Sequence, residues 1–251
     1  MGYRNWAWES GVTITASASA TGYPVSNLTS TAPWKIWRST VTTGDQWVKI
    51  DLGTSRSMAA CFLRNVLIHA GGAVRFQANA TDSWGYPTIN TAFTIPSTAR
   101  TKVLSLLFSA QSLRWVRILF VNTATVSQAV ELGIAFPTSP LTIAAGLGRG
   151  LTMARADLSL HLVSVGGQRQ VDRRSQQFRL SVDPNALDET ERDQMLALFD
   201  TVGTFQPWFL MLDTADQNLC FYGRIIEGLP VAHIGDTADA WAAPFAFEEE
   251  L

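Results

Sequence analysis

The sequence predicts a mainly β protein, with a jelly-roll β-sandwich in its first half and an α+β sandwich with one flanking amphipathic helix in its second half. Three observations lead to this prediction. Short runs of alternating apolar and polar residues recur between Ser-, Thr-, Gly- and Pro-rich turns over residues 11–136, a pattern typical of sandwiches. Prolines and glycines then cluster over 137–150, and one capped amphipathic segment follows at 188–203.

The first half holds the strands of the predicted jelly roll. The clearest is 46–52, in which Val48, Ile50 and Leu52 alternate with polar or aromatic residues and Gly53 closes the strand. Strict alternation recurs at 73–78. We expect strands at 46–52, 58–68, 73–79, 103–108, 113–121 and 130–136.

The cluster of prolines and glycines predicts a division of the chain into two domains. We expect a jelly roll with an N-terminal arm at 1–136, a linker at 137–150 and the second domain at 151–251. Residues 1–140 carry 11 Lys and Arg against 5 Asp and Glu, whereas residues 141–251 carry 8 against 16. Halves of opposite charge favour packing against further copies or charged neighbours. The basic residues are scattered singly, so we expect no nucleic-acid specificity.

The second domain contains one predicted helix among its strands. Asp188 is a suitable N-cap with Glu191 three residues later, and Gly203 is the expected C-terminal stop. Gly166 and Gly167 predict a hairpin turn. Strands are expected at about 206–213, 219–226 and 240–248. The apolar face of the helix is expected to consist of Met195, Leu196, Leu198 and Phe199.

The composition suits a folded protein with large surfaces to bury. Of the 251 residues, 47% are hydrophobic, 16% are charged and nine are Trp, which argues against disorder. No run of 18 apolar residues occurs, so we expect no membrane span. Residues 1–6 lack the residue order of a signal peptide, so we expect no export by the usual route.

No constellation of residues predicts catalysis or a bound cofactor. Cys61 and Cys220 lie in apolar runs and are predicted to be buried free thiols. His69, His161 and His233 are far apart in the sequence, and none has a second ligand at metal-binding spacing. No cluster of acidic residues in the sequence supports a Ca²⁺ site in a jelly-roll loop. We therefore expect no catalytic residue, no metal and no cofactor.

Loop aromatics are the candidate contact residues. Trp84 and Tyr86 lie among turn formers, so at least one ring should be exposed and able to stack on the C–H face of a sugar. Ordinary loop packing is the alternative. Trp6 and Trp8 precede the first predicted strand, and we expect them to dock either on their own domain or on a neighbouring subunit.

Four motifs of the first half resemble a known family. They are Gly22–Leu28, Trp37-Arg38-Ser39, Trp47–Gly53 and Trp115–Ile118. In this order they resemble the discoidin-type (coagulation-factor C-type) jelly roll, over about residues 12–136. The resemblance implies loops that contact carbohydrate or lipid, core positions for Trp37 and Trp47, and an internal partner for Arg38, for which we expect Asp51. Secreted members commonly tie their ends with a disulfide that this chain lacks, so membrane or collagen binding is not expected.

The second half is similar, at the level of pattern, to phage distal-tail and tail-tube-like domains. The segments concerned are 173–180, the helix ending at Gly203, 207–210, 222–224 and 241–249. The resemblance implies a structural virion component of a tailed bacteriophage. It would be a minor tail or tail-tip (baseplate or distal tail) protein, made in the host cytoplasm and located in the virion tail.

Its partners would be copies of itself in a trimeric or hexameric ring, other tail proteins of the tube, hub or tip, and cell-surface glycan bound by the jelly roll. The alternative is a free-standing, lectin-like carbohydrate-binding protein. A glycan hydrolase with an appended binding module ranks third.

Overall fold

The protein consists of two compact units. The structure, a computed structural model, describes residues 1–2, 4–41, 43–68, 71–95, 101–121, 129–143, 151–163, 165, 169–172, 176–184, 186–234 and 240–250. One unit comprises Met1–Leu141 with Trp208–Phe221, and the other Thr142–Pro207 with Tyr222–Leu251. The predicted linker at 137–150 stays a prediction, since 144–150 lie outside the described residues.

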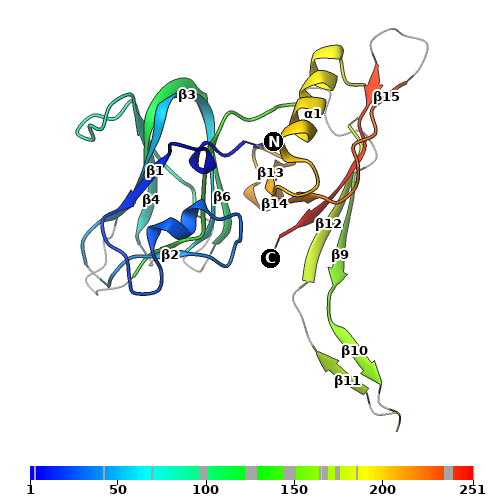
Figure 1. Cartoon of the computed structure of the whole chain (residues 1–251), viewed down its shortest axis with the longest axis horizontal. Coiled ribbons are helices and arrows are strands. Elements are labelled where there is room, and N and C mark those ends of the chain that lie inside the picture. Colours follow the sequence, from blue (N-terminus) through cyan, green and yellow to red (C-terminus); the bar gives the residue numbers. More distant parts are fainter. Residues whose placement is uncertain are drawn as a thin grey trace. The chain divides into compact units, whose positions relative to one another are not determined.

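The first unit is a β-sandwich (Figure 1). Its strands are β1 (Thr13–Ala16), β2 (Trp37–Arg38), β3 (Gln46–Val66), β4 (Ala73–Asn79), β5 (Ile89–Ala92), β6 (Thr101–Val121), β7 (Glu131–Leu132) and β8 (Ile134–Thr138). The 3-10 helices η1 (Trp6–Trp8) and η2 (Val25–Thr29) precede β2. The main sheet has the order β1-β3-β6-β4-β5, with β8 also paired to β3, and β2 pairs separately with β7.

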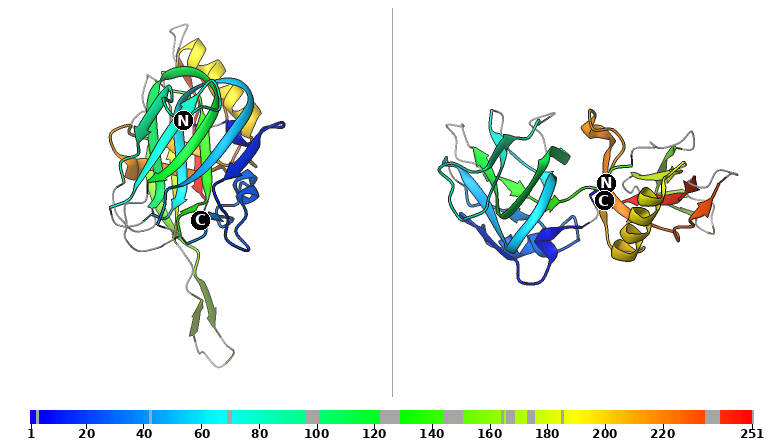
Figure 2. Two further views of the ribbon diagram at one scale, coloured as in Figure 1. Left: turned by 90° about the vertical axis from the view of Figure 1, so that its left-hand side faces the viewer. Right: turned by 90° about the horizontal axis from the view of Figure 1, so that it is seen from above.

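Two long antiparallel strands, β3 and β6, connect the two layers of this sandwich (Figure 2). The first part of β3 pairs with β1 and the later part with β8. The register between β3 and β6 shifts between Asp51 and Arg56, where Gly53 adopts a φ of 72°. Such bulges bend a strand and increase its twist. The mainly β class and the jelly-roll sandwich are therefore confirmed.

The bulge also explains where the predicted strands differ from the observed ones. The predicted strands 46–52 and 58–68 are parts of β3, and 103–108 and 113–121 are parts of β6. Gly53 was expected to close a strand, but its left-handed backbone allows β3 to continue through the bend. The strand at 73–79 is confirmed as β4, and 130–136 divides into β7 and the start of β8.

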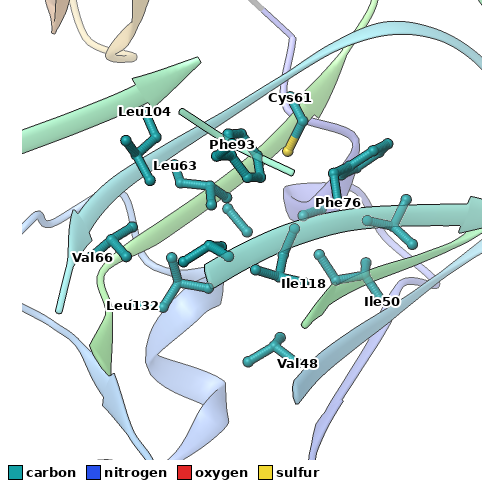
Figure 3. Packing of buried hydrophobic residues seen from close by; sticks show 14 of the residues in the cluster. Val48, Ile50, Cys61, Leu63, Val66, Phe76, Phe93, Leu104, Ile118 and Leu132 are labelled. Carbon is teal, nitrogen blue, oxygen red and sulfur yellow. The ribbon is translucent and has the colours of Figure 1, made fainter. Parts of the chain in front are cut away.

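The apolar sides of these strands form the core of the first unit (Figure 3). Val48 and Ile50 are fully buried and Leu52 is almost so, which confirms the predicted alternation along 46–52. Trp37 is also fully buried, as the resemblance implied. Trp47, in contrast, is only half-buried because it lies on the opposite side of β3 from Val48.

The segment Trp208–Phe221 packs with the first unit. It contains β13 (Trp208–Met211), η3 (Gln217–Leu219) and the start of β14 (Cys220–Ile225). The ring of Phe209 stacks on Phe62 with centroids 4.9 Å apart and meets Phe136 edge-on at 5.1 Å. A Cβ on Gly2 would approach the Phe62 ring to 2.6 Å, so glycine lets the N-terminal chain bridge to Phe209. This segment falls within the second domain predicted at 151–251, whereas the structure groups it with the first unit. Burial of Phe209 in an aromatic cluster explains the different grouping.

The second unit combines a sheet with one helix. Four consecutive strands of its sheet have the order β14-β17-β12-β9. The strands and helix are β9 (Thr152–Asp157), β10 (Leu160–Val163), β11 (Arg169–Asp172), β12 (Gln176–Val182), α1 (Glu189–Val202), β15 (Ala232–His233), β16 (Trp241–Ala242) and β17 (Phe245–Glu249). The pair β10–β11 continues β9 and β12 as a hairpin (Figure 1). Its predicted turn at Gly166 and Gly167 lies outside the described residues.

The helix α1 begins and ends as predicted. Asp188 and Glu191 form a capping box, and Gly203 caps the C-terminus with a φ of 52°. The buried stripe differs in part from the expected face, because Leu196 is 40% exposed and Phe199 is half-buried. Residues three or four positions apart lie on the same side of a helix, and in α1 such residues form the side that faces the unit. The buried stripe consists of Glu191, Met195, Leu198 and Val202.

Candidate functional site

The predicted contact residues Trp84 and Tyr86 lie in the loop between β4 and β5. Tyr86 is 97% exposed, whereas Trp84 is half-buried. The Trp84 indole Nε1 donates a 2.6 Å hydrogen bond to Asp82 Oδ1, and the Arg117 guanidinium lies 4.5 Å from the centroid of the Trp84 ring. The Trp84 ring is therefore held between a carboxylate and a cation.

Asp82 connects the loop between β4 and β5 to the strands of the sheet. Lys49 Nζ donates a 2.7 Å hydrogen bond to Asp82 Oδ2. The same ammonium lies 5.2 Å from the Trp115 ring centroid and 5.7 Å from that of Trp47. The hydrogen bond from Lys49, and secondarily that from Trp84, lowers the pKa of the Asp82 carboxyl below its ordinary value. The carboxylate thus stays charged and keeps both donors in place.

The register of the sheet brings these side chains together. Lys49 lies opposite Arg117 in the β3–β6 ladder, and Arg117 lies opposite Gln77 in the β6–β4 ladder. Side chains of a strand alternate between its two sides, so the residues between the buried core positions share one surface. We call this surface the outer face, and it consists of Trp47, Lys49 and Asp51 of β3, Arg75, Gln77 and Asn79 of β4, and Trp115 and Arg117 of β6.

A chain of amide and guanidinium groups crosses the outer face. Arg117 Nε donates to Gln77 Oε1 at 2.7 Å, and Gln77 Nε2 donates to Asn90 Oδ1 at 3.2 Å. Arg75 Nε donates to the same Asn90 oxygen at 2.9 Å. Fixed donors and acceptors next to aromatic rings are what a site for a polyhydroxylated ligand needs.

Sequence reasoning placed Trp84 and Tyr86 in this region but missed Lys49, Gln77 and Arg117. The available signal was the strand alternation itself, since it marks these three positions as facing away from the core. What the sequence lacked was the pairing of β3, β6 and β4.

The expected ion pair between Arg38 and Asp51 is wrong. Arg38 pairs with Glu131, its register partner across β2 and β7, through Nε at 2.7 Å. Asp51 instead accepts two hydrogen bonds from Arg114, at 2.6 and 2.8 Å. These bonds lower the pKa of the Asp51 carboxyl. Asp51 and Arg38 belong to different sheets, which explains why they do not pair.

Trp6 and Trp8 pack on the first unit itself. The Trp8 indole donates to the Leu28 carbonyl at 3.1 Å, and its ring meets Phe136 edge-on at 5.4 Å. The Trp6 ring lies under the guanidinium groups of Arg4 and Arg56, at 4.6 and 5.3 Å. Both rings belong to η1, which contacts β3 and β8, whereas Trp84 lies in the loop between β4 and β5. A role for Trp6 and Trp8 in binding stays a prediction.

The two thiols are buried and free, as predicted. Burial raises the pKa of Cys220 to about 12 and raises that of Cys61 further. His233 packs edge-on against Trp241, and His69 lies outside the described residues. Within the part of the chain that the structure describes, no three His, Cys, Asp or Glu side chains are grouped to hold a metal ion.

None of the described helices has both the length and the apolar character needed to cross a membrane.

Comparison with known proteins yielded similar solved structures only. No protein-family model matches the chain, and no curated protein matches it. A chitosan-binding module of a chitosanase/glucanase from Paenibacillus sp. IK-5 is 22% identical, with 54% of this chain and 99% of that chain covered and a TM-score of 0.42.

Two further similar structures carry bound sugars. The family 32 carbohydrate-binding module of NanJ from C. perfringens, in complex with galactose, is 12% identical, covering 53% of this chain and 96% of its own, with a TM-score of 0.42. The lectin domain of lectinolysin, complexed with Lewis B antigen, is 13% identical, covering 56% of this chain and 100% of its own, with a TM-score of 0.45.

Proposed function

We propose that the first unit binds carbohydrate at the outer face and the adjoining loop of Trp84 and Tyr86. The observation that carries this proposal is the immobilised Trp84 ring, held by Asp82 and Arg117 beside the almost fully exposed Tyr86. Aromatic rings fixed before binding stack on the apolar face of a sugar at little cost in conformational entropy.

Polar groups around these rings would provide the selectivity. Lys49 and Asn90 supply polar groups that are already oriented, Lys49 by its bond to Asp82 and Asn90 by the bond from the buried Gln77. A sugar hydroxyl both donates and accepts, so it can join such a chain without leaving a buried polar group unpaired. The chemistry is binding of a polyhydroxylated ligand, which is the lectin-like alternative of the sequence analysis.

The test is a glycan array followed by calorimetric titration of the best ligand. Galactose and chito-oligosaccharides belong on the array, together with acidic oligosaccharides. We expect Trp84→Ala to weaken binding at least about tenfold, equivalent to about 1.4 kcal/mol. Tyr86→Ala should weaken it as well.

Trp34→Ala is the matched control, because Trp34 is 73% exposed in the same unit but lies between η2 and β2. It should bind as the unmodified protein does. Equal binding by Trp84→Ala and Trp34→Ala, or no glycan bound at all, would refute the proposal.

A second proposed role is assembly into a ring of a phage tail, in a virion made in the host cytoplasm. The observation that favours it is β9, the last strand of its sheet, which exposes Met153 at 41% and is preceded by Leu151 at 37%. An exposed edge strand presents unpaired backbone groups that can pair with another chain. Light scattering should then show a trimer or hexamer that Met153→Lys dissociates. A monomer at all concentrations would exclude this role.

A further inference from the structure

Two arginines of the outer face have no carboxylate partner. Among the described residues, Lys49 pairs with Asp82 and Arg114 pairs with Asp51, whereas Arg75 and Arg117 take part in no ion pair. Both are half-buried. Arginine stays charged at any ordinary pH, so each carries a partly desolvated positive charge with no carboxylate in ion-pair contact, although Asp82 acts on Arg117 from a greater distance.

The two guanidinium groups are held close together by amides. Arg117 lies opposite Gln77 in the ladder, and Arg75 is two residues from Gln77 on the same strand. They are therefore diagonal neighbours, a relation in which Cα atoms are about 7–8 Å apart. The bonds from Arg117 to Gln77 and from Arg75 to Asn90 fix both side chains through Nε.

This arrangement leaves strong donors unused. Arg117 donates to the described residues through Nε alone, and one Nη of Arg75 makes only a long, 3.4 Å contact with the Asn90 carbonyl. A guanidinium has five N–H donors in a planar fork that matches a carboxylate in bidentate fashion. Neutral hydroxyl groups do not need two such forks side by side.

We propose that the outer face selects acidic glycans, with Arg75 and Arg117 binding the carboxylate of a uronic acid while Trp84 stacks on a sugar ring. This inference rests on the proposed carbohydrate binding and names its ligand class. Four cations and two carboxylates line the region formed by Lys49, Arg75, Arg114, Arg117, Asp51 and Asp82, so its net charge also favours an anionic ligand.

The test compares two probes that differ only in charge, namely oligogalacturonate and the same oligosaccharide as its methyl ester. At low salt we expect the acid to bind about tenfold more tightly than the ester. In the double variant Arg75→Gln/Arg117→Gln, the ratio of the affinity for the acid to that for the ester should fall toward one. In the unmodified protein the same ratio should shrink as salt screens the charges. The single variant Arg75→Gln, which leaves the Trp84–Arg117 contact intact, should lower the ratio in part.

The control variant is Arg155→Gln, since Arg155 lies on β9 of the second unit over the Phe178 ring. Its acid-to-ester ratio should equal that of the unmodified protein. Equal affinity for acid and ester, or a preference that survives in the double variant, would overturn the inference. If the ester still binds and its binding depends on Trp84, the proposed carbohydrate binding stands without the preference for acids. If neither probe nor any neutral glycan binds, the proposed function and this inference are both refuted. Tighter binding of a sulfated oligosaccharide than of the uronate would contradict the assignment to a carboxylate.

Discussion

The aromatic cluster around Phe209 gives the sharpest prediction about stability. Phe209 is fully buried, stacks on Phe62 at 4.9 Å and meets Phe136 edge-on at 5.1 Å. Replacing a buried Phe by Ala costs about 3–5 kcal/mol, and loss of two ring pairs places Phe209→Ala near the middle of that range, at about 4 kcal/mol. At about 2–4 °C per kcal/mol for a body of this size, the melting temperature should fall by about 8–16 °C.

The assay is thermal unfolding followed by tryptophan fluorescence, with Phe205→Ala as the control. Phe205 is 72% exposed, so its removal should change stability by no more than about 0.5 kcal/mol. A double-mutant cycle with Phe62→Ala should give a coupling energy of about 1 kcal/mol, because the two rings are in contact. Two results would show that Trp208–Phe221 does not pack in the first unit. One is that the effects of Phe209→Ala and Phe62→Ala on stability are additive, and the other is that Phe209→Ala has the same melting temperature as Phe205→Ala.

Two further predictions concern single positions. In Gly223→Ala the new Cβ would lie 1.9 Å from the Glu248 carbonyl oxygen on the neighbouring strand, so the β14–β17 pair must separate. We expect a loss of at least about 3 kcal/mol in chemical denaturation, and near-native stability would contradict this backbone contact. The pKa of Asp51 is lowered from 3.8, chiefly by its hydrogen bonds from Arg114. Its contribution to stability is therefore present above that pH and lost as the pH falls below it. In Arg114→Gln the free energy of unfolding should fall less between pH 4 and pH 2 than in the unmodified protein. An equal fall in both proteins would show that the Asp51–Arg114 pair contributes nothing to stability.

The elements with strong local signals were predictable from the sequence. The alternation along 46–52 identified the buried side of β3, and Asp188 with Glu191 identified the start of α1, because both signals depend on neighbouring residues alone. The partner of Arg38 was not predictable, since Glu131 comes next to it only through the pairing of β2 and β7. The grouping of Phe209 with Phe62 is a long-range contact of the same kind.

The residues of the candidate site were likewise predictable only in part from the sequence. Trp84 and Tyr86 were identified by their turn-forming neighbours, which predict an exposed loop. Arg117 and Gln77 were missed because alternation shows only that each lies on the side of its strand away from the core, and the ladder between β6 and β4 is what sets them side by side. A site assembled across strands therefore requires the register, which alternation alone does not provide.

The bend of β3 at Gly53 separates two regions of the chain that can vary independently. Before the bend, even-numbered residues from Gln46 to Leu52 point inward, and after it the buried series starts again at Met58. Thr54 and Ser55 in between are exposed. A residue inserted there would be absorbed by the irregular pairing instead of reversing the sides of the strand that carries Lys49. The bend is thus a place where evolution or an engineer can lengthen the chain without disturbing either the packing of the interior or the surface proposed to meet sugar.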